Sequence, residues 1–324
     1  MTHAFGAPQM TSAPSESVVV RDWQKLDADR LRPIYRAEIK RWQSTLGWDT
    51  HGMWAVVEAA RNAGTLPGIV AEDASGIRGW AFFLVNGDAL HLGALVADSS
   101  DVSHAILERV LSAPEAAQTD TAFIFVPEVA PGLSPLLADR GFASERYRYL
   151  SKRITPLPIS SVEAPAWSQR TVNDVAALLA RAYPRVDPLR SFAPLGTFEQ
   201  WREYVTGLFS AAAYGEFLPA CSVLQLGADA TRLEAVVMAT RIGARTAHLP
   251  QVAVDPAAQG RGVGRQAVSA ALDHLAQRGF SGVTLLVAEG NSKARRLYDR
   301  LGFNDTGAFI SAVRRQPRRS NSAA

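Results

Sequence analysis

Hydrophobic periodicity in the second half of the chain predicts an ordered series of helices and strands. Apolar residues recur at helical spacing over residues 172–182, 197–209, 265–278 and 292–301. Short apolar stretches at 221–226, 234–242, 249–254 and 283–288 are typical of buried strands. The order from the first of these strands (strands, helix, strand, helix, strand) predicts a mixed α/β sheet with a β-α-β core.

Segments of the first half reappear in the second half at a nearly constant offset. His91-Leu92 opens an apolar stretch whose counterpart, His248-Leu249, lies 157 residues later, and Phe142 matches Phe303 at an offset of 161 residues. Such an offset predicts tandem copies of one fold. We expect domains at 17–153 and 166–313, a proline-rich linker at 154–165, and disordered ends at 1–16 and 314–324.

Composition excludes several classes of protein. The chain has 324 residues and one cysteine, Cys221, so it has no internal disulfide framework and no cysteine-rich zinc site. No apolar run is long enough to span a membrane, and no leader peptide is visible, which predicts a cytoplasmic protein without a membrane partner. The net charge of +3 depends on Arg314, Arg315, Arg318 and Arg319 near the C-terminus. We therefore expect a solvated basic tail; its contact with nucleic acid is the alternative.

The segment most informative about function follows the strand predicted at 249–254. After Asp255-Pro256, a glycine-rich loop at 259–264 (QGRGVG) opens the helix 265–278. Glycines let the backbone approach an anion, and the free N–H groups of a helix N-terminus favour a phosphate. The alternative is a loop that merely closes a tight strand–helix connection. The spacing fits neither the dinucleotide-binding motif nor the P-loop.

Residues further along place this loop in a larger pattern. Asn291, Tyr298 and Leu301-Gly302-Phe303 follow it in order. Over roughly 249–303 the sequence resembles the acyl-CoA-binding core of the GNAT superfamily of N-acetyltransferases. The resemblance implies an α/β fold of the α+β type, with two tandem GNAT-like mixed-sheet domains. It implies acetyl-CoA as co-substrate, no metal, and cofactor contacts from Val252, Ala253, Val254, Gln259, Gly260, Arg261, Gly262, Val263, Gly264, Arg265, Asn291 and Tyr298.

The first copy lacks the residues of this cofactor-binding pattern. Its corresponding loop, residues 99–103, contains no glycine, and Ala130 and Leu137 stand where the second copy has Asn291 and Tyr298. We therefore expect the first domain to be degenerate. Its tryptophans at 23, 42, 48 and 54 are expected to pack a core or an interface between domains, with a substrate wall as the alternative.

Candidate catalytic groups follow from the chemistry of amide formation. Tyr298, which the resemblance places near the thioester sulfur, can protonate a departing thiolate (reference pKa about 8.5), because its hydroxyl, with a reference pKa of about 10, carries a proton at neutral pH. Packing of the ring is the alternative, and Asn291 is equally suited to cap its helix. His248 is the candidate base, with Glu234 on the neighbouring strand, although His248 also fits a structural role.

The expected reaction is direct attack by a primary amine of a small molecule or peptide on acetyl-CoA. Acceptor recognition is expected from residues 183–218, which offer Arg185, Asp187, Arg190, Trp201, Tyr204, Tyr214 and Glu216. The alternatives are a thiol-biosynthesis acetyltransferase of the mycothiol-synthase type and a CoA-binding sensor without turnover. The sequence is compatible with a monomer or a homodimer.

Overall fold

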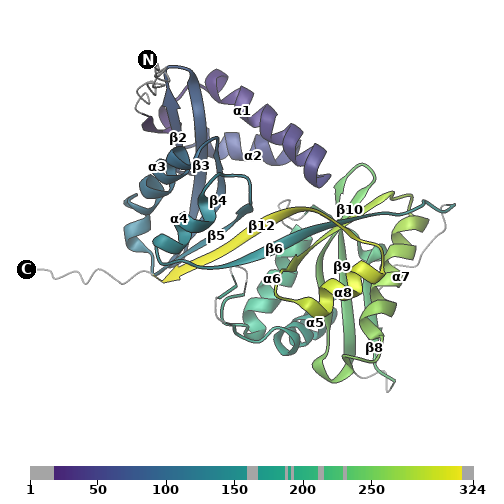
Figure 1. Cartoon of the computed structure of the whole chain (residues 1–324). Helices are drawn as coiled ribbons and strands as arrows, with labels where there is room; N and C mark the ends of the chain where they lie inside the picture. Colours follow the sequence, from purple (N-terminus) through teal and green to yellow (C-terminus); the bar gives the residue numbers. More distant parts are fainter. Residues whose placement is uncertain are drawn as a thin grey trace, which may run out of the picture.

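Twelve strands form one continuous sheet in the part of the chain that the structure describes (Figure 1). The structure is a computed structural model that describes residues 18–158, 167–186, 189–190, 193–210, 215–228 and 232–315. The order of strands across the sheet is β1-β2-β3-β4-β5-β12-β6-β11-β10-β9-β7, and β8 pairs with β9. The end predicted at 1–16 lies outside the described residues.

The first half contributes six strands and four α-helices. These are β1 (Val19–Asp22), α1 (Ala28–Arg41), α2 (His51–Asn62), β2 (Gly68–Asp73), β3 (Gly76–Asn86), β4 (Ala89–Ala97), α3 (Ser100–Leu111), β5 (Thr121–Pro127), α4 (Leu133–Asp139) and β6 (Ala143–Arg153).

The second half repeats this plan. Its elements are α5 (Gln169–Ala182), α6 (Phe198–Ser210), β7 (Glu216–Phe217), β8 (Val223–Leu226), β9 (Leu233–Gly243), β10 (Thr246–Val254), α7 (Val263–Gln277), β11 (Gly282–Ala288), α8 (Ser292–Arg300) and β12 (Asn304–Arg315). The predicted helices and strands of this half are confirmed, with boundaries that differ by at most three residues. The α/β class with a mixed sheet is confirmed as well.

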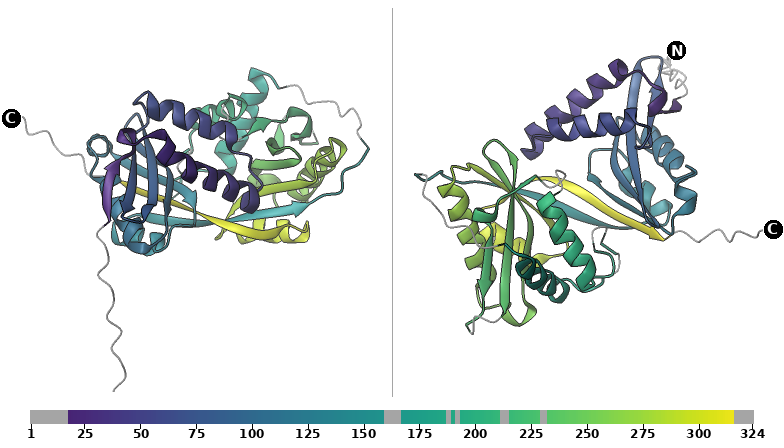
Figure 2. Two further views of the ribbon diagram at one scale, coloured as in Figure 1. Left: turned by 90° about the horizontal axis from the view of Figure 1, so that it is seen from above. Right: turned by 180° about the vertical axis from the view of Figure 1, so that it is seen from behind.

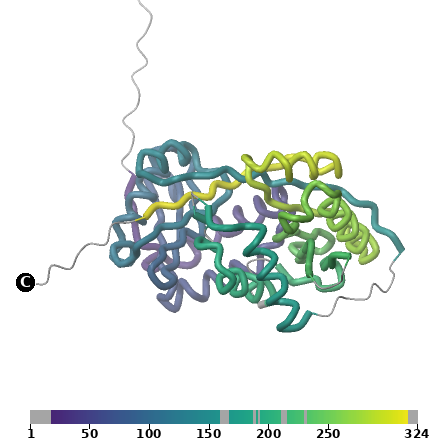
Figure 3. The backbone as a smooth tube through the Cα atoms, turned by 90° about the horizontal axis from the view of Figure 1, so that it is seen from below, coloured from purple at the N-terminus to yellow at the C-terminus, as the bar shows by residue number. Residues whose placement is uncertain are grey.

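The two halves exchange their last strands. β6 leaves the first half and pairs antiparallel with β11, from Gly282↔Arg153 to Ala288↔Tyr147. β12 returns from the second half and pairs antiparallel with β5, and the two exchanged strands also pair with each other. Figure 2 and Figure 3 show the yellow β12 running from the green half into the teal strands of the first half. The centre of the sheet is therefore built from both halves.

This exchange corrects the expected start of the basic tail. β12 continues through Arg314 and Arg315, which pair with Ala122 and Thr121 of β5. The open edge of β5 gives their backbone groups ladder partners, which local sequence could not reveal. The guanidinium of Arg314 also lies 4.9 Å over the ring of Phe142. Arg318 and Arg319 lie outside the described residues.

The four tryptophans divide between two environments. Trp23 and Trp54 are buried in a cluster under α1 and α2, in the first half. Trp42 and Trp48 pack where the halves meet, around Tyr149. There the Trp48 indole N–H donates to the Tyr149 hydroxyl at 2.8 Å, and that hydroxyl donates to a main-chain carbonyl at 2.6 Å. Within the described residues, no helix has the length and apolar character needed to cross a bilayer.

Candidate active site

The sheet opens between β10 and β11. These parallel strands pair only from Thr246↔Gly282 to Leu249↔Leu285, and then diverge. A register irregularity between β10 and β9 falls at the same place, between His248 and Gln251. Pro250 lies inside it, and a proline has no N–H to donate to a neighbouring strand. The divergence leaves one side of residues 250–254 without a partner strand.

The glycine-rich loop closes the far end of this opening. Gly260 and Gly262 have φ values of +80° and +83°, a left-handed conformation that favours glycine. A Cβ at Gly264 would lie 3.1 Å from a methyl group of Val254, so the absence of a side chain lets the loop approach β10. Among the described residues, no acceptor takes a hydrogen bond from the six N–H groups of residues 260–265. This row of donors at the N-terminus of α7 fits a pyrophosphate.

Buried ion pairs hold the loop in place. Asp255 is buried and accepts from Arg181 of α5 at 2.8 Å and from Arg232 at 2.6 Å. Burial alone would raise the pKa of Asp255, but the Ala257 N–H and the two guanidinium groups lower it overall. Asp255 therefore stays ionised and fixes the turn between β10 and α7.

The backbone of β10 turns alternate residues towards the opening. The N–H of Asp255 donates to Glu234 of β9 at 2.7 Å, so the backbone groups of Val252 and Val254 face the other way. The Val252 carbonyl accepts from the Tyr183 hydroxyl, and the Gln259 side chain reaches the Val254 carbonyl at 3.5 Å. The side chain of Ala253, by contrast, packs in the core under α5 and α6.

Tyr183, which follows α5, and Tyr298 of α8 approach the opening from opposite faces of the sheet. Tyr298 of α8 is 5% exposed, lies 5.7 Å from the ring of Phe303 and lines the cleft. Burial, followed by the nearby Tyr183, raises the pKa of Tyr298 above its usual value, so its hydroxyl stays protonated. Asn291 caps α8, accepting from the Ala294 N–H at 3.1 Å, and also lines the cleft.

The two predicted base candidates are not neighbours. His248 pairs with Thr240 of β9, six residues from Glu234, which corresponds to about 20 Å along the strand. Glu234 instead pairs with Arg261 of the loop at 3.1 Å.

His248 lies in a dry environment that opposes protonation. Its Nδ1 donates to Thr284 at 2.9 Å, because the Thr284 hydroxyl proton goes to the Ala247 carbonyl. Its ring contacts Trp48 at 5.3 Å and stacks on Tyr149 at 6.1 Å. Burial lowers the pKa of His248 to about 3, which makes the imidazole a weak base.

A cleft of about 1600 Å³ passes through the opening and is lined by both halves. Its lining includes cationic side chains of α7 and α8: Arg265, Lys293, Arg296 and Arg300. The first half contributes aromatic residues to the lining: Trp42, Trp48, Phe123, Phe125, Tyr147 and Tyr149. Of the residues expected to recognise the acceptor, Arg190, Trp201 and Tyr204 line the cleft, whereas Arg185 and Glu216 do not. Asp187 and Tyr214 lie outside the described residues. Sequence reasoning missed Glu145 and Tyr147, because only the exchange of β6 brings them here.

The corresponding helix start in the first half has no free cradle. The Ser99 side chain caps α3 by accepting from the Val102 N–H at 3.4 Å, and Asp101 places a negative charge in the first turn. A Cβ at Gly132 would lie 2.7 Å from the Ser100 hydroxyl, so the turn before α4 already covers this end. The capped N–H group, the Asp101 charge and the covering turn all disfavour an anionic ligand at this helix start.

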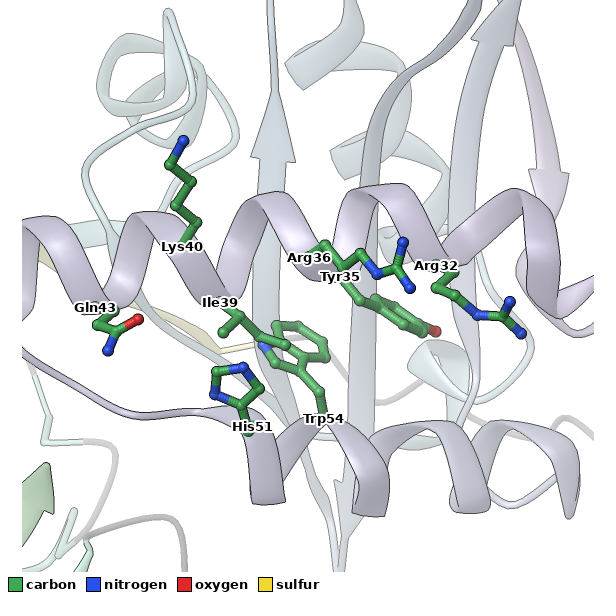
Figure 4. Close-up of a pocket in the computed structure, with 8 residues that line it drawn as sticks. All are labelled: Arg32, Tyr35, Arg36, Ile39, Lys40, Gln43, His51 and Trp54. Carbon is green, nitrogen blue, oxygen red and sulfur yellow. The ribbon is translucent and has the colours of Figure 1, made fainter. Parts of the chain in front are cut away.

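A smaller hollow of about 420 Å³ lies between α1 and α2 (Figure 4). The rings of Tyr35 and Trp54 fill the space between the two helices, whereas Lys40 points away from α2. No glycine loop takes part in its lining, which consists of Arg32, Tyr35, Arg36, Ile39, Lys40, Gln43, His51 and Trp54. Most of the residues predicted to bind the cofactor line the large cleft instead.

Diverging parallel strands that end in a glycine-rich anion cradle define an α/β fold of the acyl-CoA-binding class. Residues 173–303 match the Acetyltransferase (GNAT) family, and this part of the chain belongs to that family. The predicted membership in a family of acyltransferases is thereby confirmed.

Solved structures with this fold cover most of the chain. A GCN5-related N-acetyltransferase from Sphaerobacter thermophilus aligns with a TM-score of 0.59 at 16% identity, covering 94% of this chain and 98% of the other. A tandem GNAT protein from the clavulanic acid biosynthesis pathway aligns with a TM-score of 0.52 at 14% identity, covering 78% of this chain and 83% of the other. These likenesses confirm the fold and its tandem arrangement.

Curated relatives match only a short stretch. A mycothiol acetyltransferase from Streptosporangium roseum is 54% identical over 52 residues, which is 16% of this chain and 15% of the relative. Its counterpart from Gordonia bronchialis is 56% identical over 52 residues, 16% of this chain and 17% of the relative. The matched stretch thus spans less than a fifth of these relatives.

Proposed function

We propose that the protein transfers the acetyl group of acetyl-CoA to a primary amine of a small molecule or peptide. The observation that carries this proposal is the row of free N–H groups at residues 260–265, which faces a cleft in a GNAT fold. Acetyl-CoA, when bound, supplies an acetyl group activated as a thioester.

Residues on the α7–α8 side would bind the cofactor. The N–H groups of the loop hold the pyrophosphate, and the outward-facing backbone of Val252 and Val254 offers hydrogen bonds to the pantetheine arm. Arg265 and Lys293 place positive charge beside the phosphates. Asn291 keeps its side chain on its own helix and can still contact the cofactor.

Tyr298 would act as the acid. Its hydroxyl stays protonated, so it can donate to the sulfur as negative charge develops there. Its contact with Phe303 holds the ring in the cleft.

Calorimetric titration of the full chain with acetyl-CoA tests the binding half of the proposal. A thiol-release assay over amino sugars, polyamines, amino acids and peptides then tests transfer. Absence of acetyl-CoA binding by folded protein refutes the proposal. Tight binding without turnover on any amine supports the sensor alternative instead.

A second candidate acceptor comes from the short matches. Because mycothiol acetyltransferases share about half of the residues in a 52-residue stretch, their amine substrate is a specific candidate for this chain. Assay of that amine against simpler amines tests the idea. Equal or better turnover of unrelated amines rejects it.

A further inference from the structure

The first half places a carboxylate in the cleft of the second half. On β6, residues 145, 147 and 149 share one face of the strand, and Glu145, Tyr147 and Tyr149 all line the cleft. The strand reaches this position because it pairs with β11. The carboxylate of Glu145 lies beside the turn before α8, with Oε1 4.0 Å from the position of a Cβ at Gly290.

No described cation forms an ion pair with Glu145, although its charge acts on Tyr147 and Arg190. Glu145 is the only carboxylate among the described residues that line the cleft, and no described cation lies within 4.0 Å of it. Its neighbours on β6 differ: Arg146 pairs with Glu128 at 2.5 Å, and Arg148 pairs with Glu289 at 2.8 Å. A half-buried carboxylate among aromatic rings favours a cationic partner.

The cation that faces Glu145 across the cleft is held by other groups. Nη1 of Arg190 donates to the Pro184 carbonyl at 2.7 Å, and its guanidinium lies 5.4 Å from the centre of the Tyr183 ring. These contacts occupy Arg190, which forms no ion pair with Glu145, although the Glu145 charge still acts on it.

Tyrosine side chains line the cleft beside this carboxylate and at the opening of the sheet. Tyr147 lies next to Glu145; burial first, and then the Glu145 charge, raise the pKa of Tyr147 and keep it protonated. Tyr183, whose hydroxyl donates to the Val252 carbonyl of β10, lines the same cleft. Glu145 therefore shares one cleft with the strand that is predicted to bind the cofactor.

We propose that Glu145, contributed by the first half, binds the ammonium group of the acceptor and serves as the catalytic base. This assignment rests on the proposed acetyltransferase function. The Glu145 carboxylate takes one ammonium proton and passes it to water before attack. The amine nitrogen then forms a bond with the acetyl carbon as the carbon–sulfur bond breaks. A second proton moves from nitrogen to water, and Tyr298 protonates the departing sulfur. Both side chains are restored through water.

Neither earlier candidate is placed for this step. His248 is held between two aromatic rings with a strongly lowered pKa, and Glu234 is paired at the loop. The first half thus contributes a catalytic residue to the cleft, although it has no glycine-rich cofactor loop of its own.

The test compares Glu145→Gln with Glu145→Asp in the full chain, with Glu115→Gln as the matched control. Glu115 is exposed and remote from the cleft. Two probes serve as acceptors in the thiol-release assay: ethylamine, which is an ammonium ion at neutral pH, and hydroxylamine, which is mostly uncharged. We expect Glu145→Gln to lower kcat/KM for ethylamine by about 10²- to 10⁴-fold, as for loss of a general base. The loss with hydroxylamine should be below about tenfold, because this amine needs less help to lose its proton.

Further readouts separate catalysis from folding. Affinity for acetyl-CoA and the melting temperature should stay unchanged in Glu145→Gln, and Glu145→Asp should recover part of the ethylamine activity. Equal losses with both amines, no loss, or weaker acetyl-CoA binding would overturn the assignment. So would a wild-type protein that turns over hydroxylamine but not ethylamine. Failure of the proposed function itself would differ, since acetyl-CoA would then not bind or neither amine would be acetylated by any form.

Discussion

Replacement of Gly262 by alanine tests the anion cradle with a single methyl group. Gly262 caps α7 with φ of +83°, and a Cβ there would meet no atom within 4 Å. A clash with other parts of the fold therefore contributes nothing to the loss of stability. The loss comes from placing alanine in a left-handed backbone conformation. An L-residue in that conformation costs roughly 1–2 kcal/mol.

The protein can respond to this cost in two ways. If the loop keeps its shape, the free energy of unfolding falls by roughly 1–2 kcal/mol. If the residue leaves the left-handed region, the adjoining peptide planes rotate and N–H groups turn away from the cleft. Each hydrogen bond lost to a charged phosphate is worth about 1.5–3 kcal/mol, which corresponds to about 10- to 150-fold in the Kd for acetyl-CoA.

Gly279→Ala is the matched control at the other end of the same helix. Gly279 has φ of +79°, and its added Cβ would also meet no atom within 4 Å. Both variants should lose similar stability in denaturant titrations, but only Gly262→Ala should weaken binding in calorimetry. Unchanged affinity together with a full stability loss would leave the loop geometry undisturbed, and Gly262→Val would then be needed to block the cradle. Equal weakening of binding by both variants would refute a local role for the loop.

Three further outcomes are expected. Tyr298→Phe should lower kcat by about 10²- to 10⁴-fold with unchanged acetyl-CoA affinity, and turnover within about twofold of wild type would reject the acid role. His248 is neutral in the folded protein, so between pH 6.5 and about 3 the unfolded state binds the extra proton, and stability falls as the pH falls. Across that window His248→Phe should show a shallower slope, by up to about 1.4 kcal/mol per pH unit, in denaturant titrations; an identical slope would contradict the buried neutral imidazole. Tyr149→Phe leaves the Trp48 N–H and the Leu46 carbonyl without their partner, and should lower the free energy of unfolding by about 1–3 kcal/mol; a neutral effect in thermal melts would show that water replaces the hydroxyl.

Local sequence determined the elements of the second half and the cofactor loop. Helices at 265–278 and 292–301 were readable because their apolar faces repeat every three to four residues. The loop at 259–264 was readable because left-handed turns and close backbone approach require glycine, and few other residues satisfy both. The spacing from this loop to Asn291 and Tyr298 then indicated the family.

The partners of strands were decided only by tertiary structure. A strand shows in its sequence which side chains face a core, but its backbone groups can pair with any edge of suitable register. The stretches that form β6 and β12 therefore gave no sign that they cross between the halves, and Arg314 and Arg315 were expected in a tail. Burial followed the same rule: His248 has its lowered pKa because it is buried against Trp48 and Tyr149, residues about 200 and 100 positions away in the chain. The composite cleft, with Glu145 in it, exists because two non-adjacent strands complete one sheet.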